Sequence, residues 1–270
     1  MESKILFLDI DDTLLTKDKA VTDENADAIA RAIKAGHRIV IASGRPLLGI
    51  LPLAERLGIA GEGGYIIAMN GAEIYDCGTG RYLLRETLAP EDVEALFREA
   101  ERHGLYVHTY DGSTVLAKAD GPELRWYVGQ IHVPYRIVPE LPAGLHSAPA
   151  KVLIASLSDH EALEVCRKDA APRLLGRVSL FFSSKKLLEC VKDGVSKGNA
   201  VTKLCGLLGI PIRNSFAAGD SENDIPMLRA AGLGCAMANA TDACKDAAGY
   251  VTERDCNHSG VAEIIDKFIL

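Results

Sequence analysis

The chain has 270 residues, and its 30 lysines and arginines against 37 aspartates and glutamates give a formal net charge of −7 at pH 7. This acidic balance argues against a nucleic-acid-binding protein, because such proteins carry a basic surface. Hydrophobic residues make up 48% of the chain and charged residues 25%, which is typical of a packed globular protein rather than a disordered one. The length predicts two domains, or one domain with a large insertion.

Short apolar runs and amphipathic helical segments alternate over the first part of the chain. Strands are predicted at residues 4–8, 38–42 and 65–69, with a helix capped by Thr22 after the first and a helix delayed by Pro52 after the second. This alternation implies parallel strands with helical crossovers, and continuously apolar strands are typical of sheets buried on both faces. We therefore predict an α/β fold with a doubly wound, Rossmann-like parallel sheet.

Around Leu83 the pattern changes to helices that alternate with strand-like runs. Helices are predicted from Pro90, at 122–131 and at 159–175, where Pro172 should end the last one. The predicted strands are 105–110, 114–119, 133–138, 151–156 and 178–183. This part of the chain predicts an α+β unit with one sheet and its helices on one face.

From Leu187 the first pattern resumes with a predicted strand at 187–191 and a predicted helix at 197–208. Further strands are predicted at 215–218 and 234–237. The simplest organisation is a core domain of residues 1–82 and 187–270, interrupted by an inserted cap domain at residues 83–186.

Cysteine spacing and the N-terminus bear on where the protein works. The seven cysteines are odd in number, widely spaced and without a C-x-x-C pair, so we expect reduced thiols rather than disulfides or a zinc ribbon. The residues after Met1 show no signal-peptide pattern, and no apolar run approaches the ~20 residues that would cross a bilayer. We expect a soluble cytoplasmic protein, monomeric or weakly dimeric, with neither nucleic acid nor membrane as a partner.

Polar clusters follow several predicted core strands, where reactive residues gather in open α/β sheets. Asp9 and Asp11 follow the first strand, and Asp220 and Asp224 follow the strand that ends at Ala218. Two like charges about 4 Å apart repel by about 4 kcal/mol at an effective dielectric constant of 20, so carboxylates gathered here require a cation. Oxygen ligands select a hard ion, and Mg²⁺ suits a site of about two carboxylates, waters and a phosphate.

The two carboxylates after the first strand indicate covalent phosphoryl transfer. Because Asp9 and Asp11 are two residues apart, their side chains would share one face of an extended strand. Asp9 could attack phosphorus and form an aspartyl-phosphate. Asp11 could protonate the leaving oxygen and later deprotonate the attacking water. A metal ion would neutralise the charge that develops on the phosphoryl oxygens.

Lys197 indicates where a phosphate would bind. It lies in the first turn of a predicted helix, where it opposes the helix dipole by roughly 0.3–1 kcal/mol. An anion bound at this helix start would reverse that penalty, and Ser43 with the backbone of Gly44 offers further donors. The alternative explanations are a surface lysine stretched over apolar neighbours and a solvated acidic turn.

These motifs, in this order, resemble the haloacid dehalogenase superfamily, and within it the Cof-type phosphatases with a large inserted cap. The matching segments bracket nearly the whole chain. They are Asp9–Leu14, Ile41–Pro46, Asn70–Ala72, Gly194–Gly198, Gly219–Leu228 and Ser259–Ala262.

The resemblance implies a role for each matching residue. Asp9 would be the nucleophile and a metal ligand, and Asp11 the general acid/base that also ligates the metal through its backbone carbonyl. Asp220 would complete the protein ligands of a Mg²⁺ cofactor, and Asp224 would orient metal-bound water. The phosphate-binding residues would be Ser43, Gly44, Lys197 and Asn223.

The predicted function is Mg²⁺-dependent hydrolysis of a small phosphomonoester, such as a sugar phosphate, with the cap choosing the substrate. A phosphomutase or phosphotransferase with the same core is an alternative, in which an alcohol takes the phosphoryl group from Asp9. A non-catalytic phosphate-sensing module, phosphorylated at Asp9 by a partner, is the third possibility, although a large insertion would have no purpose there.

Overall fold

The computed structural model describes residues 2–270, which form two compact units. The first unit comprises the residues up to Gly44 together with Ile50–Leu84 and Ser196–Leu270. The second unit comprises Arg45–Gly49 and Arg85–Val195. Over the described residues, no helix is both long and apolar enough to cross a membrane.

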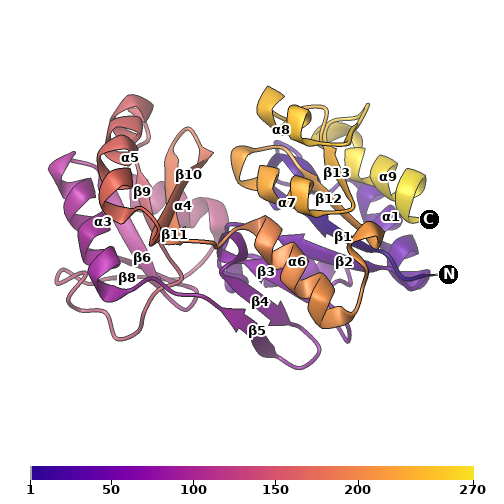
Figure 1. Cartoon of the computed structure of the whole chain (residues 1–270), viewed down its shortest axis with the longest axis horizontal. Helices are drawn as coiled ribbons and strands as arrows, with labels where there is room; N and C mark the ends of the chain where they lie inside the picture. The colour runs from indigo at the N-terminus through magenta and orange to yellow at the C-terminus, as the bar shows by residue number, and fades with distance from the viewer. Residues whose placement is uncertain (1) are drawn as a thin grey trace. The chain divides into compact units, whose positions relative to one another are not determined.

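Over its described residues, the first unit is built on an eight-stranded sheet with the strand order β14-β13-β12-β1-β2-β3-β4-β5 (Figure 1). Its strands are β1 (Ile5–Leu8), β2 (Arg38–Ala42), β3 (Tyr65–Ala68), β4 (Glu73–Asp76), β5 (Arg81–Arg85), β12 (Ser215–Gly219), β13 (Leu233–Ala236) and β14 (Tyr250–Val251). Neighbours from β14 to β3 are parallel, and β4 runs antiparallel to β3. The predicted doubly wound α/β fold is confirmed.

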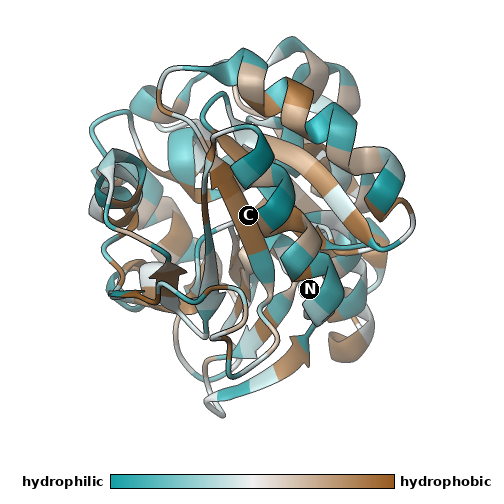
Figure 2. Ribbon diagram, turned by 90° about the vertical axis from the view of Figure 1, so that its left-hand side faces the viewer, coloured by the Kyte–Doolittle hydropathy of each residue, from teal (hydrophilic) through white to brown (hydrophobic). Residues whose placement is uncertain are grey.

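Helices flank this sheet and complete its core. They are α1 (Asp23–Lys34), α2 (Leu51–Arg56), α6 (Lys197–Leu208), α7 (Ile225–Ala230), α8 (Asp242–Ala247) and α9 (Gly260–Ile264). Figure 2 shows largely hydrophobic strands beside helices that alternate between hydrophobic and hydrophilic residues. Thr22 caps α1 as predicted, because its side chain accepts the N–H of Asn25. Pro52 lies in the first turn of α2, where its missing N–H removes no helical bond.

The second unit contains a mainly antiparallel sheet, six-stranded over its described residues, with the order β10-β11-β9-β6-β7-β8. Its strands are β6 (Tyr106–Asp111), β7 (Thr114–Ala117), β8 (Tyr135–Ile137), β9 (Lys151–Ala155), β10 (Val178–Ser184) and β11 (Leu187–Lys192). Its helices are α3 (Pro90–Arg102), α4 (Pro122–Ile131) and α5 (His160–Leu174). Apolar residues of α3 and α5 bury one face of this sheet, and Phe97 and Leu163 are among them.

The boundary between the two units differs from the predicted one. The sequence predicts residues 187–191 as a core strand, whereas β11 pairs antiparallel with β10 and β9 in the second sheet. An apolar run shows that a strand is buried, but it does not show which sheet holds that strand. The second unit therefore extends to Val195 instead of ending at residue 186, and it also takes Arg45–Gly49.

Helix α5 ends at Leu174, two residues after Pro172 and close to the predicted end, and the buried Ala170 and Leu174 hold its last turn against the core. One further prediction for the second unit is wrong, because its helices do not all lie on one face. Val107 packs into the core under α3 and α5, whereas Tyr110, on the opposite face of β6, lies with its Oη 2.5 Å from the Oη of Tyr127 in α4.

Candidate active site

Asp9 is the first residue after β1, and its amide donates to the carbonyl of Ala218 in β12 at 3.1 Å. This bond joins the ends of two parallel strands, so the polar residues after each strand meet at one edge of the sheet. The side chain of Asp9 is 10% exposed. The first acidic residue of the chain's N-terminal motif is therefore nearly enclosed.

The Asp11 carboxylate bonds Lys19, and it is not among the carboxylates that gather around Asp9. The strand ends at Leu8, and the chain then turns through Ile10–Leu14, where Asp12 adopts a left-handed φ of 58°. The Asp11 carboxylate is 41% exposed and lies 2.9 Å from Lys19 Nζ. The two-residue spacing is a poor guide here because the strand ends at Leu8, before either aspartate.

Lys197, in the first turn of α6, is fully buried and bonded to two carboxylates. Its Nζ lies 2.5 Å from Asp9 Oδ1 and 2.6 Å from Asp224 Oδ1. A surface lysine is thereby excluded as the explanation of this residue. Its ammonium lies instead between two acidic groups from distant parts of the chain.

Asp220 and Asp224 are held by hydrogen bonds that fix their carboxylates. Asp220 accepts from the hydroxyls of Thr13 at 3.0 Å and Ser221 at 2.9 Å. Asp224 Oδ2 accepts the backbone N–H groups of both Asp220 and Ser221 at 3.0 Å. Each oxygen of Asp220 thus accepts one hydroxyl bond, whereas Asp224 accepts two amides and an ammonium.

The cluster holds more negative than positive charge. Oxygen atoms of Asp9, Asp220 and Asp224 lie within 4.8 Å of one another. Burial, followed by the Asp224 carboxylate, raises the pKa of Asp9 well above its ordinary value, and Lys197 opposes this shift only in part. Burial and the Asp224 carboxylate also raise the pKa of Asp220 to about 7. Burial alone would lower the pKa of Lys197, but the carboxylates of Asp224 and Asp9 outweigh it and raise that pKa.

The donor set of the cluster fits a divalent metal ion. Three carboxylates, one directly after β1 and two in the segment after β12, supply only oxygen atoms, and hard cations prefer oxygen ligands. A divalent cation would offset the charge that one ammonium leaves uncompensated. These residues could therefore hold a divalent metal beside Asp9.

Ser43, Asn70 and Asn223 form the neighbouring polar side of the site. Ser43 and Asn70 are nearly completely buried, and the backbone N–H of Asn70 donates to the backbone carbonyl of Ser43 at 3.0 Å. Asn223 Nδ2 donates to Asn70 Oδ1 at 3.1 Å. A Cβ atom at Gly44 would lie 2.9 Å from Asn70 Oδ1, so only a glycine lets the backbone pass this close to the amide.

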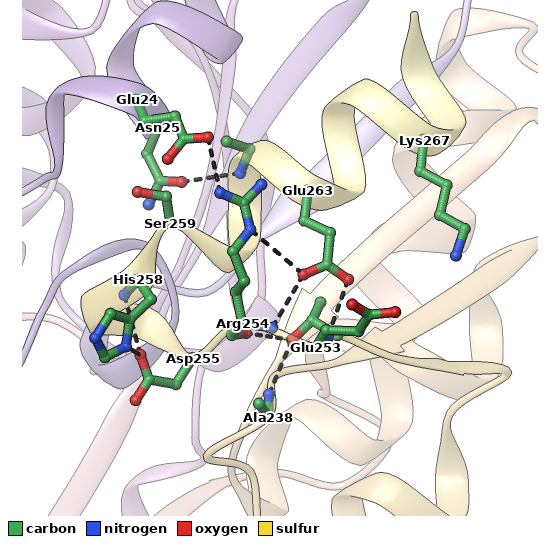
Figure 3. A network of polar contacts seen from close by, with 12 residues as sticks. Glu24, Asn25, Ala238, Glu253, Arg254, Asp255, His258, Ser259, Glu263 and Lys267 are labelled. Atoms are coloured by element: carbon green, nitrogen blue, oxygen red, sulfur yellow. Dashed lines mark hydrogen bonds and ion pairs between the residues drawn. The ribbon is translucent and has the colours of Figure 1, made fainter.

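The segment before α9 supports the turn that follows Asp9. Asn239 donates to the carbonyl of Asp12 at 2.8 Å and accepts the N–H of Cys256 at 2.9 Å, so it ties the two loops together. In Figure 3, Arg254 lies between Glu24 and Glu263, with its Nη1 2.7 Å from Glu24 Oε1. This network fixes the segment that leads into α9.

The structure brings together most of the residues that the sequence singled out. One group contains Asp9, Lys197, Asp220 and Asp224, and the adjoining group contains Ser43, Gly44 and Asn223. Asp11 is the exception, because its carboxylate bonds Lys19.

Sequence reasoning gave no role to Thr13, Asn70 or Asn239. Thr13 stands in the same short motif as Asp9, and Asn70 in the matched segment Asn70–Ala72, so both could have been found there. Asn239 lies outside every matched segment and carries no such signal.

Comparison with known proteins places the chain in a family. Residues 6–265 match the family model described as haloacid dehalogenase-like hydrolase. A crystal structure of a haloacid dehalogenase-like hydrolase from Bacteroides thetaiotaomicron superposes with a TM-score of 0.89 at 31% sequence identity, covering 98% of this chain and 99% of that one. This chain is a haloacid dehalogenase-like hydrolase.

Several relatives of this hydrolase are named as phosphatases of small molecules. The 5-amino-6-(5-phospho-D-ribitylamino)uracil phosphatase YcsE of Bacillus subtilis is 29% identical, with 100% of this chain and 97% of the relative covered. The HMP-PP phosphatase of Cronobacter sakazakii is also 29% identical, with 86% and 83% covered. The hydrolase described here is accordingly a phosphatase, and its family context supports small phosphorylated metabolites as substrates.

Proposed function

We propose that the protein hydrolyses a small phosphomonoester, such as a sugar phosphate, with Mg²⁺ and through an aspartyl-phosphate on Asp9. The observation that carries the proposal is the enclosed Asp9 carboxylate, 2.5 Å from a buried ammonium and beside two further carboxylates. Such a nucleophile can approach a phosphoryl group only where cations offset the combined negative charge.

Bound Mg²⁺ would supply charge neutralisation between Asp9 and the phosphoryl oxygens. Asp9 and Asp220, with the backbone carbonyl of Asp11, are its proposed protein ligands. Asp224, whose Oδ2 already accepts two amides, suits the orientation of metal-bound water better than direct ligation. Lys197 already donates to Asp9 and Asp224, and an ammonium has three donors, so its third donor would bind a phosphoryl oxygen.

The proposed reaction has two displacements at phosphorus. In the first, an oxygen of Asp9 forms a bond to phosphorus, the ester P–O bond breaks, and Asp11 gives its proton to the leaving oxygen. In the second, Asp11 takes a proton from water, the water oxygen bonds to phosphorus, and the bond to Asp9 breaks. For both steps the Asp11 side chain must exchange Lys19 for the reacting oxygen.

The other proposed phosphate ligands are Ser43, the backbone N–H of Gly44 and Asn223. They come from the segments that follow β2 and β12 in one sheet. They can therefore hold the phosphoryl group of different substrates, whatever alcohol it is esterified to. The second unit is proposed as the cap that chooses the ester. We place the reaction in the cytoplasm, because all seven cysteines are free and suit a reducing compartment.

Turnover of p-nitrophenyl phosphate and of a panel of sugar phosphates, nucleotides and vitamin phosphates tests the proposal. The wild type should release phosphate with Mg²⁺ and stop after EDTA treatment. Asp9→Asn should lose at least about a thousandfold in kcat, as expected for loss of a nucleophile. Asp18→Asn makes the same charge change at an exposed position and is the matched control.

Two outcomes would contradict the proposal. Full turnover in EDTA would exclude the metal, and full turnover by Asp9→Asn would exclude the nucleophile. Adding an alcohol distinguishes hydrolysis from transfer, since a phosphotransferase would yield the phosphorylated alcohol instead of inorganic phosphate.

A further inference from the structure

Asn70, which the proposed mechanism does not use, lies in an unusual backbone turn beside the site. Met69, Asn70 and Gly71 have φ angles of 52°, 57° and 98°. Glycine adopts this left-handed region readily, whereas most other residues are strained in it. Two consecutive non-glycine residues in this region persist only where the surrounding structure enforces them, and such strain concentrates at functional sites.

The turn connects the two segments that carry the proposed phosphate ligands. On one side, the backbone N–H of Asn70 donates to the backbone carbonyl of Ser43 at 3.0 Å. On the other side, a Cβ atom at Gly71 would lie 2.2 Å from the Ser196 carbonyl oxygen. The turn therefore packs directly against the residue that caps α6, the helix that begins with Lys197.

The side chain of Asn70 is bonded at one end only. Its Oδ1 accepts from Asn223 Nδ2 at 3.1 Å. Its Nδ2 is enclosed and finds no hydrogen-bond partner within the part of the chain that the structure describes. The bond to Asn223 is therefore the one side-chain hydrogen bond that Asn70 makes within the described residues.

We propose that Asn70 is a positioning residue that fixes the amide orientation of Asn223. This inference rests on the proposed function, in which Asn223 binds the phosphoryl group. The amide of Asn223 has a donor end and an acceptor end, and only the donor end attracts a phosphoryl oxygen. By accepting one hydrogen of Asn223 Nδ2, Asn70 Oδ1 selects the orientation in which the second hydrogen of Nδ2 remains for the ligand.

Asn70→Gly separates this role from the strained backbone. Glycine suits the left-handed turn, so the variant removes the amide while keeping the conformation. With Mg²⁺ present, kcat/KM for p-nitrophenyl phosphate should fall about tenfold, and the inhibition constant of inorganic phosphate should rise by a similar factor, the scale of one hydrogen bond to a charged group. The urea midpoint of unfolding should stay close to that of the wild type.

A double-mutant cycle with Asn223→Ala identifies the route of the effect. If Asn70 acts through Asn223, the double variant should be no slower than Asn223→Ala alone. Asn25→Ala is the matched control, since Asn25 is also buried, accepts one bond, from Ala262 N at 2.8 Å, and leaves its Nδ2 unpaired within the described residues. This control should lose stability without changing the inhibition constant of phosphate.

Wild-type kinetics in Asn70→Gly, or losses that multiply in the double variant, would overturn the inference while leaving the proposed function intact. Failure of the proposed function would instead remove turnover from the wild type and from Asn25→Ala alike. In that case calorimetric binding of inorganic phosphate to the wild type and to Asn70→Gly still decides the inference, and equal affinities would overturn it.

Discussion

Each unit of the molecule contains a fully buried lysine, and the two lysines differ in the number of carboxylates around them. In the second unit, Lys151 Nζ lies 2.9 Å from Glu189 Oε2, while Ser183 donates to Glu189 Oε1 at 2.7 Å. Burial lowers the pKa of Lys151, but Glu189 and then Tyr127 outweigh it and raise that pKa. One ammonium faces one carboxylate, so this buried pair is electrically balanced.

In the first unit, Lys197 contacts two carboxylates and a third lies close by. Burial and then the Asp224 carboxylate raise the pKa values of Asp9 and Asp220. Three carboxylates thus lie around one ammonium. The comparison teaches that burial alone does not distinguish a structural lysine from a functional one. An excess of carboxylates around a buried lysine is the distinguishing feature, because a bound cation is then needed to neutralise the remaining negative charge.

Replacing each lysine by methionine should separate the two roles most clearly. Lys151→Met and Lys197→Met should each lower the free energy of unfolding by about 3–5 kcal/mol, because each leaves a buried carboxylate unpaired. Only Lys197→Met should also lose about a hundredfold or more in kcat/KM, the scale of losing a preorganised donor to the transition state. Urea unfolding and p-nitrophenyl phosphate kinetics measure the two effects.

The double variant Lys151→Met/Glu189→Leu is the control for this comparison. It removes both charges, so it should recover most of the stability lost by Lys151→Met. An equal loss of activity per folded molecule in Lys151→Met and Lys197→Met would break the distinction between the two lysines.

Mg²⁺ should stabilise the protein through the acidic cluster alone. At a Mg²⁺ concentration about 100 times its dissociation constant, the free energy of unfolding should rise by about 2.7 kcal/mol. Thermal unfolding with Mg²⁺ and with EDTA measures the gain. Asp220→Asn should lose most of it and Glu189→Gln should keep it. An unchanged gain in Asp220→Asn would place the ion elsewhere.

The pH dependence of stability should depend on Asp220 when metal is absent. Its pKa is about 7 in the folded protein against an ordinary 3.8, so between these values the folded state holds a proton that the unfolded chain has lost. The contribution of Asp220 to stability is therefore greatest at low pH and declines as pH rises through about 7, by on the order of a few kcal/mol.

Chemical unfolding of the wild type and Asp220→Asn in EDTA, from pH 4 to 8, isolates this contribution as the difference between their curves. Mg²⁺ should flatten the difference, since the ion binds the deprotonated carboxylate. A difference that grows in favour of the wild type as pH rises would contradict the raised pKa.

Arg254→Ala should have the smallest effect on stability among these variants. Arg254 is 35% exposed and pairs with Glu24, which is 54% exposed, so solvent screens the interaction. The free energy of unfolding should fall by about 1 kcal/mol or less, as measured by urea unfolding. A loss as large as that of Lys151→Met would show that ion pairing rather than burial makes the two lysines costly to replace.

Much of the core could be predicted from local patterns. Strand β2 and helix α6 begin and end at the predicted residues, because apolar runs and capping residues act over short stretches of chain. The meeting of Asp9 with Asp220 follows from the rule that carboxyl ends of parallel strands share one edge. The placement of β11 could not be predicted, since its sheet is chosen by partners elsewhere in the chain.

The finer geometry of the site also lay beyond the sequence. The Asp11 carboxylate bonds Lys19, in a turn that begins directly after Asp9, and no spacing rule reports such a turn. Asn239 acts through two hydrogen bonds to distant loops, which leave no periodic pattern. Local patterns thus identified the charged groups, whereas the amides that hold them required the fold.

The bond between Asp9 and Lys197 spans 188 positions of the chain, and that between Thr13 and Asp220 spans 207. During synthesis from the N-terminus, Asp9 is therefore made 188 residues before its counterion Lys197, so their bond cannot form until well over half of the chain has emerged from the ribosome. The active site can therefore form only after α6 has been synthesised. Fragments that stop before α6 would contain Asp9 and its motif but would lack catalytic activity.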